Sequence, residues 1–384
     1  MMNKNRTHPQ TSSDVNLKNT FKYNFQYGKL NAKSFPLRLW RKISNQCLSS
    51  LNVNNMMSYN ESQGELGLRV EIMKYLNISR GVSCQPEQII ICSGTQSCLT
   101  LLCQLFRSHS TNVAIEDPGY DGARDVFINS GYNVIPISLE NGSIDVGELE
   151  NSLAKIIYIT PSHQFPTGAV MPIHKRLKVL NWAIKNKAII IEDDYDSELR
   201  YNTKPIPSIH CIESQENVLY IGTFSKSLAP ALRLSYMVLP QSWLEKYRNL
   251  FAKYNSTVPF HQQKILQQFM SLGYWDSHLR KSCLSYKKKH DTLVGTINQV
   301  MGDKVTIHGK NAGLHILLEF NNGLYEKELI EKANNHGVLV YPVSRYWMRL
   351  ERYSNNMILL GFSELNENEI VEGINILNHA WFGN

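Results

Sequence analysis

The sequence lacks the features that mark membrane proteins and disulfide-bonded secreted domains. No run approaches the roughly 18–20 consecutive apolar residues of a membrane-spanning helix, and residues 1–20 are polar, without the apolar core of a signal peptide. The seven cysteines are odd in number and include no C-x-x-C pair, so neither a disulfide framework nor a zinc site is indicated. We therefore expect a cytoplasmic protein without a membrane partner.

A large excess of charge of one sign is also missing. Over 384 residues the formal net charge is +7, and the lysines are scattered apart from the run Lys287-Lys288-Lys289-His290. Such a cluster is more typical of a solvated helix face than of a nucleic-acid surface, so no nucleic-acid partner is expected. An apolar content of 42% and a charged content of 19% are typical of a globular protein, and the length suffices for two domains.

Changes of pattern along the chain predict a tail, an N-terminal segment and two domains. Residues 1–20, rich in Asn, Thr and Ser, favour a disordered tail, and residues 21–50 are expected to pack on the smaller domain. Strands and helices alternate from 88 to 240, which is typical of an α/β fold with a mostly parallel sheet; residues 51–245 are therefore predicted to form the large domain. Helices and then short strand-like runs follow, which predicts a smaller α+β domain over residues 246–384.

The loop Gly222-Thr223-Phe224-Ser225-Lys226 carries the most informative residues. It lies between two apolar strand-like runs, 218–221 and 234–239, and Arg233 follows seven positions after the lysine. A lysine forms an imine or carries a proton only as a neutral amine, which requires partial burial or a cationic neighbour. A guanidinium fork suits a dianionic phosphate. The plainer alternative is a surface loop with two solvated cations.

Other predicted strand ends carry further candidates. Ser93-Gly94-Thr95-Gln96 follows a strand and opens a helix, whose backbone N–H groups can cradle a phosphate. Tyr120 follows a Pro-Gly turn, where it can stack on a flat ring or pack locally. Glu192-Asp193-Asp194-Tyr195-Asp196 ends an apolar strand, and four acids there indicate a metal site or a solvated edge. Ligands bind at the carboxyl ends of strands in α/β sheets, so these residues are expected to meet.

These stretches, in this order, resemble the fold-type I enzymes that use pyridoxal 5′-phosphate (PLP). The lysine loop is most similar to that of the aminotransferase-like domain of MocR-type regulators. The resemblance implies a PLP-transferase fold of type I, a homodimer, and a Schiff base between PLP and Lys226. It further implies that PLP is held by Ser93, Gly94, Thr95, Gln96, Tyr120, His163, Asp193, Tyr195, Thr223, Ser225, Arg233 and, from the second subunit, Tyr59.

In enzymes of this kind a carboxylate pairs with the pyridine nitrogen and keeps the ring protonated, so that the ring acts as an electron sink. Asp193 is the predicted partner of the nitrogen, and Asp194, one position along, is the alternative. Tyr195 is predicted to donate to the phenolic oxygen of PLP. The predicted catalytic residues are therefore Lys226, Asp193 and Tyr195.

The sequence departs from the common aminotransferase pattern beside the cofactor. Many relatives have an Asn that bonds the phenolic oxygen where this chain has Phe165. That hydrogen bond cannot come from a phenyl ring. Either His163 or Gln164 approaches the ring instead, or His163 is a structural residue in a turn.

A second departure concerns the substrate. Many of these enzymes clamp the substrate carboxylate with an Arg where this chain has Leu359. A leucine cannot bond a carboxylate, and an unpaired carboxylate in a dry pocket is costly. Arg345 is the predicted replacement, ahead of Arg349 and Arg352, and His315 is also predicted to contact the substrate.

The resemblance leaves three functional hypotheses. The first is a PLP-dependent aminotransferase acting on an amino acid or related amine. The second is another PLP reaction in a biosynthetic pathway, such as cyclisation, elimination, racemisation or oxidation. The third is a non-catalytic ligand-sensing module of a MocR-type regulator. Only about 35 residues precede Pro36, too few for a DNA-binding winged helix, which weighs against a transcription factor.

Overall fold

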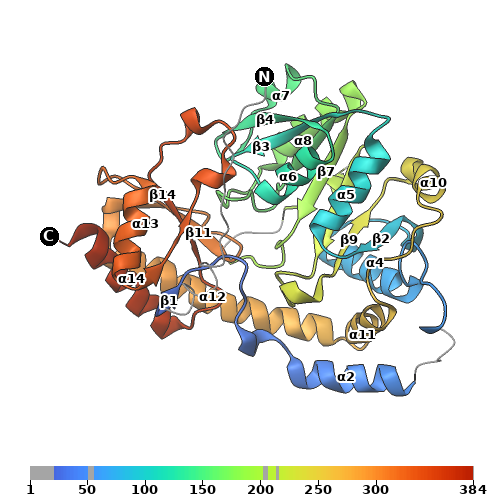
Figure 1. The fold of residues 1–384 in the computed structure, drawn as a ribbon, viewed down its shortest axis with the longest axis horizontal. Helices are drawn as coiled ribbons and strands as arrows, with labels where there is room; N and C mark the ends of the chain where they lie inside the picture. The colour runs from blue at the N-terminus through green and yellow to red at the C-terminus, as the bar shows by residue number, and fades with distance from the viewer. Residues whose placement is uncertain (1–20, 51–55, 202–205, 213–215, 384) are drawn as a thin grey trace.

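The computed structural model describes residues 21–50, 56–201, 206–212 and 216–383, so the predicted tail over residues 1–20 lies outside the described residues. Two bodies lie side by side, each built on a β-sheet, and the long helix α12 (Tyr274–Val300) runs along both (Figure 1). In the described part of the chain, no helix combines the length and apolar character that crossing a bilayer requires.

The larger body contains an eight-stranded sheet in the order β2-β9-β8-β7-β6-β3-β4-β5. The run β8-β7-β6-β3-β4 is parallel, whereas β9 is antiparallel to both its neighbours and β5 is antiparallel to β4. The sheet is therefore mixed at its edges, and the predicted parallel α/β core is confirmed. Its strands are β2 (Ile89–Cys92), β3 (Asn112–Asp117), β4 (Asn133–Glu140), β5 (Ser143–Ile144), β6 (Ile156–Ile159), β7 (Ile189–Asp194), β8 (Val218–Thr223) and β9 (Ser235–Val238).

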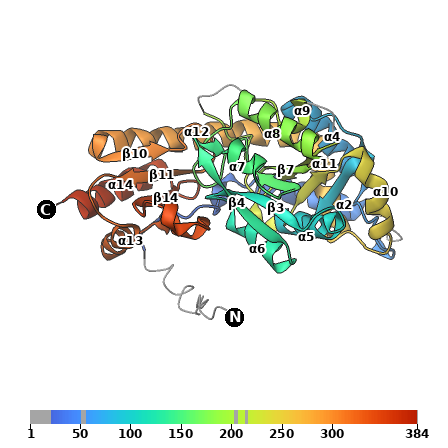
Figure 2. The ribbon, with the colours of Figure 1, turned by 90° about the horizontal axis from the view of Figure 1, so that it is seen from above.

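Helices cover both faces of this sheet, as Figure 2 shows from above. In β7, Ile189 and Ile191 pack with the helices on one face, and Ile190 packs with those on the other. Successive side chains of a strand point to opposite faces, so a central strand covered on both sides is apolar throughout. The covering helices are α4 (Leu66–Arg80), α5 (Thr95–Phe106), α6 (Asp121–Asn129), α7 (Val146–Glu150), α8 (Ile173–Asn186), α9 (Ile209–Ile212), α10 (Gln241–Leu250) and α11 (Phe260–Ser271).

The smaller body is a four-stranded antiparallel sheet in the order β10-β11-β14-β13, covered by helices. This confirms the predicted α+β character of the C-terminal part. Its elements are β10 (Val305–His308), β11 (His315–Phe320), β12 (Val338–Leu339), β13 (Tyr341–Pro342), β14 (Met357–Gly361), α13 (Glu326–Asn335) and α14 (Glu367–Phe382). Short 3₁₀ turns occupy Ala32–Ser34, Pro86–Gln88, Pro230–Leu232, Gly302–Lys304, Ser344–Tyr346 and Leu350–Arg352.

The first part of α12 packs with an apolar cluster of the large body, and its second part packs with that of the small body. Tyr247 of α10 and Phe269 of α11 belong to the apolar clusters of the large sheet. The apolar side chains near the end of α12, Leu293 and Ile297, belong instead to the cluster of the small sheet. The change of pattern after Pro240 marks the end of the strands, and the helices that follow still cover the large sheet.

The N-terminal segment contacts both bodies. β1 (Tyr23–Asn24) pairs in parallel with β12 of the small body. The helix α2 (Leu37–Ser49) turns its buried residues, Ile43 and Cys47, toward the large body. Packing on the smaller domain is therefore seen only in the first part of residues 21–50.

A backbone hydrogen bond from Gly361, at the end of β14, connects the N-terminal segment to the small sheet. The N–H of Gly361 donates to Phe25 O over 2.9 Å. A Cβ on Gly361 would lie 2.6 Å from both Cα and N of Tyr27. The N-terminal strand therefore reaches its place only because this position has no side chain.

We predict that Gly361→Ala lowers the free energy of unfolding, because the new methyl meets backbone atoms that cannot turn aside. Overpacking of this kind costs roughly 1–3 kcal/mol. Gly295→Ala is the matched control: a Cβ there meets nothing within 4 Å, and in a helix the change stabilises by about 1 kcal/mol. Denaturant titrations would test this, and equal stabilities of the two variants would contradict it.

Candidate active site

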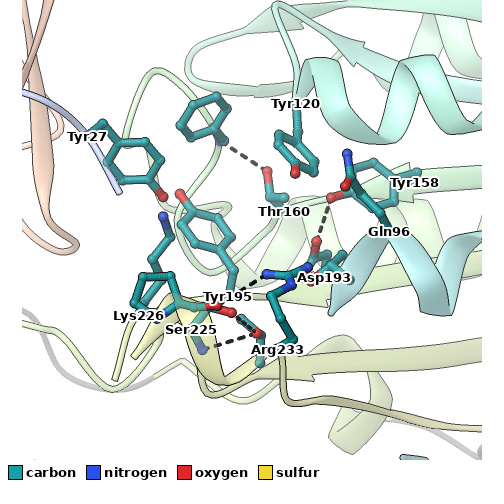
Figure 3. A pocket seen from close by; sticks show the side chains of 14 residues that line it. Tyr27, Gln96, Tyr120, Tyr158, Thr160, Asp193, Tyr195, Ser225, Lys226 and Arg233 are labelled. Carbon is teal, nitrogen blue, oxygen red and sulfur yellow. Dashed lines mark hydrogen bonds between the residues drawn. The ribbon is translucent and has the colours of Figure 1, made fainter. Parts of the chain in front are cut away.

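A cavity of about 220 Å³ opens where the predicted residues converge, at the carboxyl ends of β6, β7 and β8 (Figure 3). Parallel strands bring their carboxyl ends to one edge of a sheet, which is where ligands bind in α/β folds. The cavity is lined by Tyr27, Thr95, Gln96, Tyr120, Tyr158, Thr160, Phe165, Asp193, Tyr195, Thr223, Ser225, Lys226, Pro230 and Arg233.

Lys226 enters the cavity from the loop after β8. Its Nζ lies 3.8 Å from the ring centroid of Tyr27, on the N-terminal segment. Burial lowers the pKa of Lys226 to about 8, although Asp196 and Asp193 act in the opposite direction. A substantial fraction of the amine is therefore neutral near physiological pH, which is the form that attacks a carbonyl carbon.

Asp193 is the carboxylate that faces the cavity. Tyr158 OH donates to its Oδ2 over 2.6 Å, while its buried Oδ1 has no hydrogen-bond partner among the described residues. Burial raises the pKa of Asp193 to about 7, and the hydrogen bond from Tyr158 opposes that rise. An unpartnered buried oxygen is costly, so this atom is ready to accept a proton donor from a ligand.

Asp194 points to the other face of the sheet, because side chains alternate along β7. Arg80 Nε and Tyr220 OH each donate to its Oδ2 over 2.6 Å. Although burial acts in the opposite direction, Arg80 and Tyr220 lower the pKa of Asp194. Asp194 thus belongs to a buried ion pair and not to the cavity, and the structure favours Asp193 of the two alternatives.

The opposite end of the cavity combines a cation, hydroxyls and a helix N-terminus. Arg233 Nη2 donates to Ser93 O over 3.4 Å, and a Cβ on Gly94 would collide with that guanidinium. Thr95 opens α5, whose free N–H groups attract anions. Thr223 Oγ1 donates to Ser225 Oγ over 3.0 Å. Ser93 and Gly94 do not line the cavity; they position Arg233.

Aromatic side chains form the remaining walls. The ring centroid of Phe165 lies 5.3 Å from that of Tyr27 and 6.0 Å from that of Tyr120. Phe165 N donates to Thr160 Oγ1 over 3.0 Å, and that hydroxyl donates to Glu116 Oε2 over 2.8 Å. Phe165 therefore presents an apolar face to the cavity from a loop that buried hydrogen bonds hold.

Tyr195 lines the cavity, but His163 lies behind it. Tyr195 OH donates to His163 O over 2.8 Å, and His163 Nδ1 lies 2.9 Å from Asp196 Oδ2. Gln164 Nε2 is engaged with Pro118 O. Neither His163 nor Gln164 lines the cavity, so the structure favours the structural alternative for His163.

His315 and Tyr59 also stand outside the cavity. His315 is fully buried beneath Phe165 and donates from Nε2 to Pro166 O over 2.9 Å. Tyr59 is 89% exposed. The predicted contact of Tyr59 with the site of a second subunit stays a prediction.

The residues predicted to bind the substrate carboxylate lie beyond the cavity. Arg345 is exposed and donates from Nε to Asp121 Oδ2 over 2.7 Å. Arg349 is tied to Asp117 and Glu148. Leu359 is 1% exposed in an apolar cluster with Phe165 and Tyr195, so packing confirms that this position holds no polar group.

Four lining residues escaped the sequence analysis: Tyr27, Tyr158, Thr160 and Pro230. Tyr158 and Thr160 lie at the end of β6, just before the predicted site residue His163, and the period-two alternation of side chains along the strand was the available signal. No local sequence pattern predicts that Tyr27 lines the cavity, because the pairing of β1 with β12 of the small body places the N-terminal segment there.

Comparison with known proteins agrees with this geometry. Residues 25–352 match the family model described as Aminotransferase class I and II. The chain belongs to this family. Members of this family use pyridoxal phosphate as their cofactor. The protein is therefore a PLP-dependent transferase.

Regulators and enzymes both occur among the similar proteins. The chain is 40% identical, over 93% of its length and 76% of the relative, to the uncharacterized HTH-type transcriptional regulator YdeL of Bacillus subtilis. It is 29% identical to the probable rhizopine catabolism regulatory protein MocR of Rhizobium meliloti, over 93% of this chain and 72% of that one. Kynurenine aminotransferase of Pyrococcus horikoshii, solved in complex with PMP, superposes with a TM-score of 0.86 at 26% identity, covering 98% of this chain and 95% of that one.

The residues present fit PLP. The unpartnered Oδ1 of Asp193 suits the protonated pyridine nitrogen. Arg233 and the start of α5 suit the phosphate, and the amine of Lys226 suits the aldehyde carbon. Groups suited to the ring nitrogen, the phosphate and the aldehyde carbon of PLP thus line one cavity, and Phe165 stands where many relatives have an Asn.

We predict that substitution of Asp193 impairs turnover, whereas substitution of its neighbour Asp194 impairs stability. Asp193→Asn should keep the fold and retain PLP through its phosphate, but lose turnover, because one charge-assisted hydrogen bond worth about 1.5–3 kcal/mol is removed from the ring. Asp194→Asn should instead destabilise the protein by about 3–5 kcal/mol, because it leaves the buried Arg80 unpaired. Thermal unfolding and cofactor absorbance of both variants would test this; near-normal turnover of Asp193→Asn would reject its role.

Proposed function

We propose that this protein is an aminotransferase that moves the amino group of an amino acid to a keto acid. One observation carries the proposal: Lys226, with its amine of lowered pKa, and Asp193, with a buried oxygen that lacks a partner, line the same cavity as Arg233. Amine, carboxylate and phosphate-binding cation are the three protein groups that PLP chemistry on amino acids requires.

PLP, when bound, supplies a carbonyl carbon that exchanges imines and a ring that withdraws electrons from the substrate Cα. Asp193 holds the proton on the ring nitrogen, so that the ring keeps its electron demand. With the cofactor bound, the amine of Lys226 would be the base that accepts the Cα proton of the substrate and the acid that gives it back. Tyr27 and Phe165 exclude water from the side of Lys226.

A second candidate is favoured by a different observation. The relatives YdeL and MocR are described as regulators, and each is matched over most of this chain. A domain that binds PLP and an amino acid without turnover would then serve as a ligand sensor. Other PLP reactions, such as elimination or racemisation, would use the same groups in a differently lined pocket.

We predict that the purified protein with PLP shows the visible absorption band of a lysine imine, and that Lys226→Ala abolishes both the band and turnover. Lys246→Ala is the control, since that lysine lies outside the cavity and contacts Ser108. The decisive measurement is incubation with single amino acids, with and without a keto acid acceptor.

Formation of a keto acid together with the amine form of the cofactor supports transamination. A product formed without an acceptor supports another PLP reaction, and a spectral change without any product supports the sensor. Failure to bind PLP at all would reject the whole proposal.

The proposal includes a homodimer, in which Tyr59 of one subunit reaches the phosphate of the other. In a single chain Tyr59 is exposed to solvent and outside the cavity. A large exposed aromatic residue on a loop is suited to an interface. Sedimentation of the protein tests the homodimer. The amount of PLP retained by the Tyr59→Phe variant tests the contact with the phosphate.

Arg345 is proposed to bind the substrate carboxylate at the mouth of the cavity. It is already ion-paired with Asp121, so a carboxylate must displace that partner. Its guanidinium carbon lies 5.5 Å from the ring centroid of Tyr346, which in turn packs 4.8 Å from Phe165. Arg345 thus lies one aromatic layer away from the cavity wall.

We predict that Arg345→Ala weakens binding of phenylalanine about tenfold, the equivalent of roughly 1.5 kcal/mol for one charge-assisted hydrogen bond. Binding of phenethylamine, which has no carboxylate, should be unchanged. Arg352→Ala is the control, because that side chain is exposed beside Ser138. Spectral titration of the PLP band measures both ligands, and equal effects on the two would reject Arg345 as the carboxylate partner.

A further inference from the structure

A second cavity of about 700 Å³ is lined mainly by the segment that precedes α2 and by α12. It shares no lining residue with the active-site cavity. We call it the α12 groove. It is lined by Asn31, Lys33, Ser34, Phe35, Pro36, Leu39, Phe269, Tyr274, Ser277, His278, Lys281, Ser282, Ser285, Tyr286 and Lys289.

The lining of the α12 groove combines positive charge, hydroxyls and an apolar wall. Three of the lining residues are lysines and four are serines, and none of them is Asp or Glu. Phe35, Leu39 and Phe269 form the apolar part. A concave surface of this kind, with a few cations and hydroxyl donors beside apolar groups, complements an organic anion.

Lys289 points independently to an anion. Its side chain is buried, with the residue only 5% exposed, and its Nζ donates to Ser363 O over 2.7 Å. Among the described residues it forms no ion pair; Glu364, Glu367 and Glu369 act on it only from a distance. A buried ammonium without a paired charge is unfavourable, and a bound anion would supply the missing partner.

The groove is connected to the lysine loop by one hydrogen bond. His278, which is buried in its wall, donates from Nε2 to Ser227 O over 2.7 Å. Ser227 follows Lys226 directly. An anion beside Lys281 and His278 would make His278 a stronger donor to that carbonyl and so restrain the loop that carries the catalytic lysine.

We propose that the α12 groove binds a small organic anion, a phosphate or carboxylate on an apolar body, and that its occupancy restrains the Lys226 loop through His278 and Ser227. The anionic group lies among the three lysines, and the apolar body lies against Phe35, Leu39 and Phe269. The site is regulatory in position, because it shares no lining residue with the active-site cavity.

Calorimetry on the PLP-saturated protein tests the binding. The probes are phenyl phosphate and benzoate, with benzyl alcohol as the neutral control. The double variant Lys33→Met/Lys281→Met should bind the anions at least tenfold more weakly than the wild type, whereas Lys288→Met, an exposed lysine of α12 outside the groove, should stay within twofold. Absence of binding, equal weakening by Lys288→Met, or equal affinity for benzyl alcohol would overturn the proposal.

The comparison of the two anions distinguishes the two ligand classes. Tighter binding of phenyl phosphate assigns the groove to phosphate esters, and tighter binding of benzoate assigns it to carboxylates. Hydrogen exchange of the wild-type protein tests the connection: amides of residues 224–229 should exchange several-fold more slowly when the groove is filled. Unchanged exchange with the anion bound would overturn the restraint of the loop.

Discussion

The site depends on the alternation of side chains at the end of β7. The side chain of Asp193 points toward the cavity, and its Oδ1 has no hydrogen-bond partner among the described residues. The side chain of Asp194 points into the core, where Arg80 and Tyr220 donate hydrogen bonds to it. Both carboxylates are buried, yet their pKa values shift in opposite directions. Of these two adjacent acids, Asp194 therefore forms a structural ion pair, and Asp193 remains available to a cofactor.

Burial also determines the pKa of Lys226, which lines the same cavity as Asp193. The pKa of Lys226 is lowered to about 8 and that of Asp193 is raised to about 7, in each case chiefly by burial. The enclosure is made by Tyr27 from the N-terminal segment and by Phe165 from the loop after β6. The chemistry of the lysine therefore depends on a residue that belongs, through β1 and β12, to the other body of the molecule.

Where this chain departs from the common aminotransferase pattern, apolar packing replaces polar contact. Phe165 and Leu359 lie in one apolar cluster with Tyr195, so the two substitutions are neighbours in space although they are far apart in the sequence. The cations that line the described cavity are Lys226 and Arg233, and Arg345 is paired with Asp121 at its border. The core of the small sheet therefore offers no cation at the position where many relatives have an arginine.

The sequence by itself determined the α/β fold and the strand ends that converge at the cavity, because strand periodicity and loop chemistry are local properties. It did not determine the placement of His163 and His315 behind the cavity wall, or the entry of Tyr27 and Tyr158 into the cavity. It also did not determine which sheet the helices after Pro240 cover, since covering helices look alike whichever sheet they pack against. Those features result from packing between segments distant in the chain, which only the tertiary structure decides.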